Sequence, residues 1–223
     1  MDKMIVYEDN VLLVVHKPVG IATETARVGQ ADLVSELKNY RKRKGEDTYI
    51  GVVHRLDQPV EGLLVFAKDG GTAKKLSGGL QRGTLTKKYA ALVAGVPQAP
   101  EGELADYLLK DGRTNTSRVV PKEMKGAKAA SLRWRILRHN EAVSMLEIEL
   151  YTGRHHQIRV QMAHAGFPLL GDFKYGSAES KEISGRLGIN STALLAYAVG
   201  LTHPSTGKRM EFSLNFDKFN IIF

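Results

Sequence analysis

The sequence of 223 residues contains no cysteine. Disulfides, thiol nucleophiles and cysteine-based metal sites are therefore excluded, and a reducing compartment is compatible with the chain. A long uncharged apolar stretch is also missing, which excludes a transmembrane helix. The first ten residues, MDKMIVYEDN, include acidic side chains and show no cleavage-site pattern, so no signal peptide is predicted. We expect a cytoplasmic protein that makes no membrane contact.

Positive charge is what the chain has in excess. Lys and Arg number 32 against 24 Asp and Glu, which gives a formal net charge of +8. Because each phosphate that a cation neutralises releases counterions, this excess favours a polyanionic partner. Charge alone does not separate RNA from DNA. The length suits one sizeable domain or two small ones.

Hydrophobic periodicity predicts many strands and few helices. Short strands are expected at 4–8 and 11–16, a helix at 31–44, strand–loop–strand at 52–68, a weaker helical pattern at 69–82, a strand at 85–95, β-rich structure over 103–150, a helix at 155–165, and strands at 192–203 and 208–214. This order predicts an α+β (mixed α/β) fold on a large, mainly antiparallel mixed β-sheet flanked by helices and loops.

Two basic stretches each allow two interpretations. Lys17-Pro18-Val19-Gly20 is typical of a structural turn, and it is also compatible with a loop near a phosphate. The run from Arg41 to Lys44 ends a predicted helix, where cations complement the helix dipole. Four consecutive cations exceed what capping needs, so contact with an RNA backbone is the alternative.

The stretch VVHRLDQPVEGLLVFAK at 52–68 contains the most informative motif. Pro59 interrupts it, so we expect Asp57 at the end of a first strand, where a rigid scaffold can present a reactive group. On its own, this pattern also fits a strand-end ion pair or an Asp that bonds its own turn.

Four blocks resemble one family in the right order. HRLD with GLLVFAK is followed by KKYAALV at 87–93, then by GRHHQIRVQMAHAGFPLLGDFKYG at 153–176 and LLAYAVGLTHPSTGKRMEF at 194–212. The chain thus resembles the RluA family of pseudouridine synthases over residues 4 to 214. The resemblance implies an isomerase with a single catalytic domain over 1–223, without a separate N-terminal S4-type RNA-binding domain.

The resemblance also implies roles for individual residues. Asp57 would be the catalytic nucleophile, Tyr89 the aromatic residue beside the target base, and Arg159 the ion-pair partner of Asp57. The substrate-binding residues would be Arg55, which helps to displace the flipped base, together with His54, Arg154 and Gln157. No metal and no cofactor are expected. The expected partner is a structured ribosomal or transfer RNA, bound by a monomer.

The chemistry of the side chains supports these roles independently. A free Asp is ionised at neutral pH and attacks without a general base. A pocket that excludes water would raise the pKa of Asp57, and a neighbouring guanidinium such as that of Arg159 opposes this rise. Enzymes that act on a base flip it out of its stack, and the long, flat side chain of Arg55 suits the gap that is left.

Some positions depart from the family pattern. Val60 and Glu61 stand where Thr and Ser are usual, and Gln161 and Ala196 stand where His is usual. These departures leave open an RNA-binding module without activity.

A second alternative is a metal-dependent hydrolase built on His155, His156, His164 and Asp172. His156 and His164 lie two helical turns apart, which is too far for one metal ion. A kinase is disfavoured because a Gly-rich loop, a strand Lys and a DFG-like motif are missing.

Overall fold

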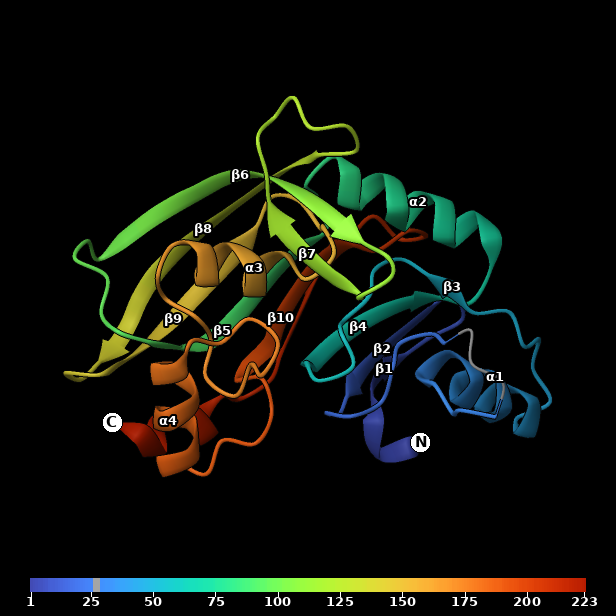
Figure 1. The fold of residues 1–223 in the computed structure, drawn as a ribbon. Coiled ribbons are helices and arrows are strands. Elements are labelled where there is room, and N and C mark those ends of the chain that lie inside the picture. Colours follow the sequence, from blue (N-terminus) through green and yellow to red (C-terminus); the bar gives the residue numbers. More distant parts are fainter. Residues whose placement is uncertain (26–28) are drawn as a thin grey trace. The chain divides into compact units, whose positions relative to one another are not determined.

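The computed structural model describes residues 1–25 and 29–223, without the side chains of residues 2, 218, 220 and 221. The chain divides into two compact units, whose helices and strands are labelled in Figure 1. Unit 1 comprises residues 1–87 and 196–214, and unit 2 comprises residues 88–195 and 215–223. Among the residues described, no helix is long and apolar enough to cross a membrane.

Unit 1 is built on strands that mostly pair antiparallel, with two helices. Its strands are β1 (Ile5–Glu8), β2 (Leu12–Lys17), β3 (Gly51–Val52), β4 (Glu61–Ala67), β10 (Leu194–Thr202, whose first two residues lie in unit 2) and β11 (Arg209–Ser213). The order is β1-β2-β4-β10, β3 also pairs with β4, and β11 pairs with β10. The helices are α1 (Leu33–Arg43) and α2 (Gly70–Gln81), and a short 3-10 turn (Asp2–Met4) precedes β1.

The two central strands of unit 1 are buried along most of their length. Four consecutive residues of β2, from Leu12 to Val15, are fully buried. Such a continuous apolar run is what a strand covered on both faces requires. Val14 pairs with Val65 of β4, and both pack in a core with Leu76 of α2 and Val199 of β10.

The helices of unit 1 begin at side-chain caps. Asp32 accepts a hydrogen bond from the Ser35 amide at 2.7 Å and starts α1, and Asp69 does the same for Thr72 at 2.8 Å and starts α2. The predicted helix at 31–44 is confirmed. The glycine pair within α2 does not interrupt it, because the helix continues to Gln81.

The cations at the end of α1 divide between structure and solvent. Arg41 is buried and donates from Nη1 to the carbonyls of Tyr49 and Lys68. Lys44 pairs with Glu8 at 3.1 Å and Glu46 at 3.3 Å. Two of the four cations are thus used by the fold, and the other two, at positions 42 and 43, are exposed.

Unit 2 is a second antiparallel arrangement, also with two helices. Its strands are β5 (Thr86–Ala94, which begins at the boundary), β6 (Glu101–Asp111), β7 (Thr116–Val119), β8 (Lys128–His139) and β9 (Val143–Leu150), in the order β5-β9-β8-β6-β7. The helices are α3 (Gln157–His164) and α4 (Ala178–Arg186), and a 3-10 turn (Asp217–Ile222) lies near the end. In the core, Val160 of α3 packs against Leu108 of β6 and Ala130 of β8.

The predicted α+β fold on mainly antiparallel strands is confirmed, and one helix was missed. The sequence of α4, AESKEISGR, contains a single large apolar residue, Ile183, so it shows no periodic apolar face. The helix forms because Ser177 caps it, accepting from the Ser180 amide at 3.1 Å, and because Ile183 is buried.

Candidate active site

The HRLD motif lies in a loop of unit 1. Strand β3 ends at Val52, so the expectation that Asp57 ends a strand is wrong. Only residues 51 and 52 pair with β4, and the chain then leaves the ladder until residue 61. Asp57 is half-buried in this loop.

Hydrogen bonds to the segment after β2 fix the loop. The Thr23 hydroxyl donates to the Leu56 carbonyl at 2.9 Å, and the Leu56 amide donates back to that hydroxyl at 3.2 Å. The Gly20 amide donates to the Gln58 carbonyl at 2.9 Å. Because Leu56 is buried and its neighbours are not, the loop is anchored between Arg55 and Asp57.

The buried side chain of Lys17 stabilises this loop through hydrogen bonds, a role that the sequence analysis missed. Its side chain is fully buried, and Nζ donates to the carbonyls of Pro18 (3.1 Å), Ile21 (2.7 Å) and Gln58 (3.2 Å). Burial lowers the pKa of Lys17 to about 8, and the carboxylates of Asp57 and Glu61 oppose that shift. The charges of the Lys17 ammonium and of the Asp57 carboxylate therefore act on each other within unit 1. The structural interpretation of the Lys17–Gly20 turn is correct.

Glu61, one of the departures from the family pattern, is engaged inside unit 1. Its Oε1 lies 2.9 Å from Nε2 of His16, and its charge also acts on Lys17. Part of the negative charge that this residue brings to the loop is thus compensated by the protein itself.

Gly62 follows Glu61 and permits a close approach to β10. Its φ is +142°, and a Cβ built at this position would lie 2.5 Å from the Cβ and the carbonyl oxygen of Ala196. Glycine is therefore required where β4 leaves the loop. The close approach also explains why a small residue stands at position 196.

His54 lies in the interior against β4. Its Nε2 accepts from the Val65 amide at 3.2 Å, so in the neutral ring Nδ1 carries the proton. Burial, reinforced by the charge of Lys87, lowers the pKa of His54 to about 3. Nδ1 has no hydrogen-bond partner within the described part of the chain. Contact of His54 with a substrate stays a prediction.

Lys87 is a second buried amine of unit 1, at the start of β5. Its side chain is buried, and burial lowers its pKa to about 8. The residues that the structure describes offer it neither a hydrogen bond nor an ion pair. An ammonium in this position lacks the compensation that Lys17 has.

Arg55 is the exposed member of the motif. Its side chain is 69% exposed and its Nε forms an ion pair with Glu24. The guanidinium can reach solvent, but insertion into an RNA helix would require this pair to open. An exposed pair of this kind contributes little, about 0–1 kcal/mol, so it would open readily.

Arg159 is positioned in unit 2 by Asp172, which the sequence analysis considered only as a possible metal ligand. Its Nε and Nη2 donate to the two carboxylate oxygens of Asp172 at 2.6 and 2.8 Å, and both side chains are buried. Burial raises the pKa of Asp172, but Arg159 and the amides of Lys174 and Tyr175 outweigh it, so the pKa lies below its usual value. The pair is charged at neutral pH.

Tyr175 covers the guanidinium on one face. The centre of the Arg159 guanidinium lies 5.1 Å from the centre of the Tyr175 ring. The Tyr175 hydroxyl lies 2.6 Å from Nδ1 of His156 and accepts from the Ser117 amide at 2.8 Å. His156 adopts a left-handed backbone with φ +55°, an uncommon conformation for a residue with a side chain.

Two of the three histidines of the metal alternative, His155 and His156, make other contacts. His155 stacks on His156 with 3.7 Å between ring centres, and it bonds Ser117 and Asn115. No group of three or more potential ligands able to hold a metal occurs among the described residues. Asp172, the carboxylate of that alternative, is the partner of Arg159.

Gln157 shapes the loop before α3. Its Oε1 accepts from the Thr152 hydroxyl at 2.8 Å and the Arg154 amide at 2.9 Å, and its Nε2 donates to the Ser131 carbonyl at 3.0 Å. Arg154 is exposed and donates from Nε to the Ala129 carbonyl at 2.8 Å. A direct contact of either residue with a substrate stays a prediction.

The predicted catalytic residues belong to different units. Asp57 lies in unit 1, whereas Tyr89 and Arg159 lie in unit 2. Tyr89 is buried in β5, where it is paired with Ile148 of β9. The pairing of Asp57 with Arg159 therefore stays a prediction. Gln161, another departure, is buried and donates from Nε2 to Asp106 at 2.7 Å.

Comparison with known proteins gives a consistent result. The family model described as RNA pseudouridylate synthase matches residues 11–164. The chain is 36% identical over 205 residues to the uncharacterized RNA pseudouridine synthase YhcT of Bacillus subtilis, covering 91% of this chain and 65% of that protein. It is 32% identical over 216 residues to the ribosomal large subunit pseudouridine synthase C of Buchnera aphidicola, covering 96% and 68%.

Other relatives and a solved structure extend this result. The ribosomal large subunit pseudouridine synthase D of Vibrio cholerae is 34% identical over 217 residues, covering 93% of this chain and 65% of that protein. The chain thus spans about two thirds of the length of these relatives. The human RNA pseudouridylate synthase domain containing 4 has the same fold, with a TM-score of 0.78 at 22% identity, covering 99% of this chain and 91% of that one.

Proposed function

The chain belongs to the RNA pseudouridylate synthase family, in agreement with the RluA-type motifs of its sequence, and we propose that it isomerises specific uridines in RNA to pseudouridine. The observation that carries this proposal is the loop containing Asp57. Asp57 is half-buried, it lies beside an anchored Leu56, and the buried ammonium of Lys17 acts on its charge. A carboxylate presented in this way can act as a nucleophile without a general base.

The reaction rearranges bonds without net oxidation or reduction. The bond between uracil nitrogen 1 and the ribose breaks, and a bond between carbon 5 and the ribose forms. The proton leaves carbon 5, and nitrogen 1 gains one. Asp57 acts as the nucleophile, on either the sugar or the base ring, and is released when the new bond is complete. No cofactor takes part.

The other predicted residues act around this carboxylate in our proposal. Arg159 pairs with Asp57 and keeps it charged when the base excludes water. Tyr89 packs on the uracil and brings a hydroxyl near carbon 5. Arg55 leaves Glu24 and occupies the gap in the RNA stack. His54 supports the HRLD loop from the interior of unit 1. Arg154 contacts the RNA backbone, and Gln157 holds the loop that carries Arg154.

The substrate in this proposal is a structured ribosomal or transfer RNA, bound by a monomer in the cytoplasm. The net charge of +8 supports a polyanionic substrate, because neutralised phosphates release counterions. Two of the relatives named above are ribosomal large subunit pseudouridine synthases, which supports ribosomal RNA in particular.

Tritium release tests the proposal. Unmodified transcripts of ribosomal and transfer RNAs carry tritium at uracil carbon 5, and the protein is expected to release it to solvent from a limited set of positions. The Asp57→Asn variant should release none while its affinity for RNA stays within about twofold, because only the nucleophile has changed. The matched control is Asp47→Asn, which alters an exposed carboxylate of unit 1 that accepts from the Tyr49 amide in its own turn.

The outcomes separate the alternatives. Absence of release by the wild type on every RNA, with binding retained, would favour a binding module without activity. Undiminished release by Asp57→Asn would remove this residue from the mechanism. For Arg159 the informative variant is Arg159→Lys, because removal of the whole side chain would leave Asp172 buried without its partner.

A further inference from the structure

One segment of unit 2 concentrates positive charge. Residues 110–128 contain six cations and two acids, so 19 residues account for half of the net charge of +8. The segment runs from the end of β6 through β7 to the start of β8, and all six cations are exposed. They are Lys110, Arg113, Arg118, Lys122, Lys125 and Lys128. We call these side chains the hairpin cations.

The hairpin cations differ from other cations of the same unit because none of them is held in an ion pair within the described residues, although the charge of Asp111 acts on Arg118. By contrast, Arg133 pairs with Glu101 at 2.7 Å and Arg135 with Glu147 at 2.7 Å. The nearby Asp111 caps its own turn instead, accepting from the Arg113 amide at 2.8 Å.

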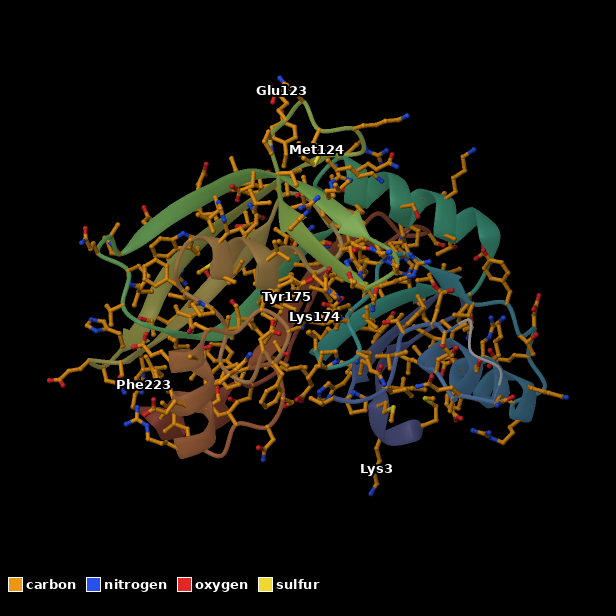
Figure 2. The ribbon with its side chains drawn as sticks, viewed as in Figure 1. Lys3, Glu123, Met124, Lys174, Tyr175 and Phe223 are labelled. Atoms are coloured by element: carbon orange, nitrogen blue, oxygen red, sulfur yellow. The ribbon has the colours of Figure 1, made fainter. Side chains whose placement is uncertain are left out.

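The shape of the segment favours contact with a large partner. Figure 2 shows Glu123 and Met124 on the loop between β7 and β8, which projects away from the strands of unit 2. Met124 is among the exposed large hydrophobic residues. An exposed loop with uncompensated charge attracts an extended anion better than a paired surface does, because paired charges already cancel.

Two hydrogen bonds tie the segment to the residues around Arg159. Lys174, two positions after Asp172, donates from Nζ to the Asn115 carbonyl at the tip of the β6–β7 hairpin, at 2.8 Å. Arg154 donates to the Ala129 carbonyl, directly after the last hairpin cation, at 2.8 Å. Lys174 and Arg154 are themselves cations that form no ion pair with an acid in the described part of the chain. The segment is therefore connected by hydrogen bonds to the loop before α3 and to the residues after Asp172.

We propose that the hairpin cations, together with Arg154 and Lys174, bind the phosphate backbone of the substrate RNA. The identity of the reacting nucleotide rests on the proposed function, whereas the RNA contact rests on charge and placement alone. Phosphate contacts of this kind set the register of the RNA and carry no sequence preference. Affinity then depends steeply on salt, because each contact releases counterions.

Two double variants with equal charge test the surface. Lys122→Gln/Lys125→Gln removes two hairpin cations, and Arg133→Gln/Arg135→Gln removes two paired cations. Each lowers the net charge by two, so a difference between them reports position and not total charge. Fluorescence anisotropy measures binding of a fluorescein-labelled, unmodified transfer RNA transcript over a series of salt concentrations, and thermal unfolding confirms that both variants are folded.

The expected result is a smaller salt dependence for the hairpin variant alone. The slope of log affinity against log salt should decrease by about 2, one for each lost phosphate contact. The paired-cation variant should keep the wild-type slope within about half a unit. Equal slopes in the two variants would overturn the proposal, as would competition by polyglutamate that matches competition by RNA.

Tritium release separates this inference from the proposed function. If the wild type releases tritium and the two variants bind alike, the surface is wrong and the enzyme assignment stands. If the wild type binds RNA through the hairpin cations and releases no tritium, the surface stands and the enzyme assignment is wrong.

Discussion

Arg159 and Asp172 form a buried, bidentate ion pair in which two guanidinium nitrogens meet two carboxylate oxygens at 2.6 and 2.8 Å. The pair fixes the plane of the guanidinium, and the Tyr175 ring covers one face of it. In the proposed reaction, Arg159 would therefore meet Asp57 with an orientation already set. A single guanidinium would then be shared between two carboxylates.

The first prediction concerns the loss of this partner. Asp172→Asn should lower the free energy of unfolding by about 3 kcal/mol, because a buried guanidinium loses its counter-charge. The double variant Arg159→Leu/Asp172→Leu should cost less than Asp172→Asn alone, since no charge is left buried. Urea unfolding measures both. Asp106→Asn is the control, because Asp106 contacts α3 through Gln161 and not through Arg159.

This pair also predicts a pH dependence. The pKa of Asp172 lies below its usual value in the folded state, so its contribution to stability is complete above the unfolded pKa of about 3.9. It is lost as the pH falls through the lower folded value. The stability difference between wild type and Asp172→Asn should thus be constant from pH 7 to pH 5 and shrink only in stronger acid. A difference that already disappears at pH 5 would contradict the ion pair.

The second prediction concerns Lys17 and the alkaline side of the rate profile. With a pKa of about 8, its ammonium loses a proton above that pH, and with it one donor to the loop carbonyls and the charge that acts on Asp57. The single-turnover rate should therefore fall as the pH rises from 8 to 9.5. The Lys87→Met variant should keep this decline. A flat profile up to pH 9.5 would show that the reaction does not depend on the charge of Lys17.

Removal of the Lys17 ammonium should abolish most of the activity. Lys17→Met leaves the carbonyls of Pro18, Ile21 and Gln58 without their shared donor, so the loop loses its support. Lys3→Met is the matched control, because Figure 2 shows Lys3 extending away from the body of unit 1. Tritium release from both variants, beside circular dichroism, measures the effect.

Much of the fold follows from the sequence because it depends on local patterns. The apolar runs of β2 and β4, the Asp32 cap and the Gly45 end of α1 all leave a signal within a few residues. The end of strand β3 at Val52, before Asp57, leaves no such local signal, because its pairing with β4 decides where the strand stops. The α4 helix was missed since it is held by a cap and one apolar contact.

The candidate site was predicted only in part for a related reason. Motifs pointed to Asp57, Tyr89 and Arg159, but a motif does not reveal which side chain faces which. Asp172 lies 13 residues after Arg159, and no periodicity connects them. The burial of Lys17 was equally invisible, since a Lys next to Pro is usually a solvated turn residue.

The third prediction concerns Lys87, the buried amine that has no hydrogen-bond or ion-pair partner among the described residues. Its pKa is about 8 in the folded state and about 10.4 in the unfolded chain, so protonation opposes folding below pH 8. Lys87→Met should raise the free energy of unfolding at pH 7 by up to about 3 kcal/mol. The gain should diminish as the pH rises from 8 to 10.5, because the wild type then folds with a neutral amine. A loss of stability at pH 7 would show that the amine has a partner.

The fourth prediction concerns the glycine at the start of β4. Gly62→Ala should destabilise the protein by about 4 kcal/mol, because the new Cβ meets the Ala196 backbone and φ is +142°. Gly45→Ala is the control, with a φ of +71° and open space around it. It should cost about 1 kcal/mol. Equal costs for the two variants would mean that β4 can move away from residue 196.

The enclosure of the Lys17 amine has a practical consequence. Reagents that acylate lysines will modify the solvated amines of α1 and of the β6–β8 region first, and residue 17 only after the loop has opened. The rate at which Lys17 is acylated relative to the exposed lysines, measured by mass spectrometry, therefore reports how often the HRLD loop opens. It would read out whether a bound nucleic acid tightens or loosens that loop, without any need for catalysis.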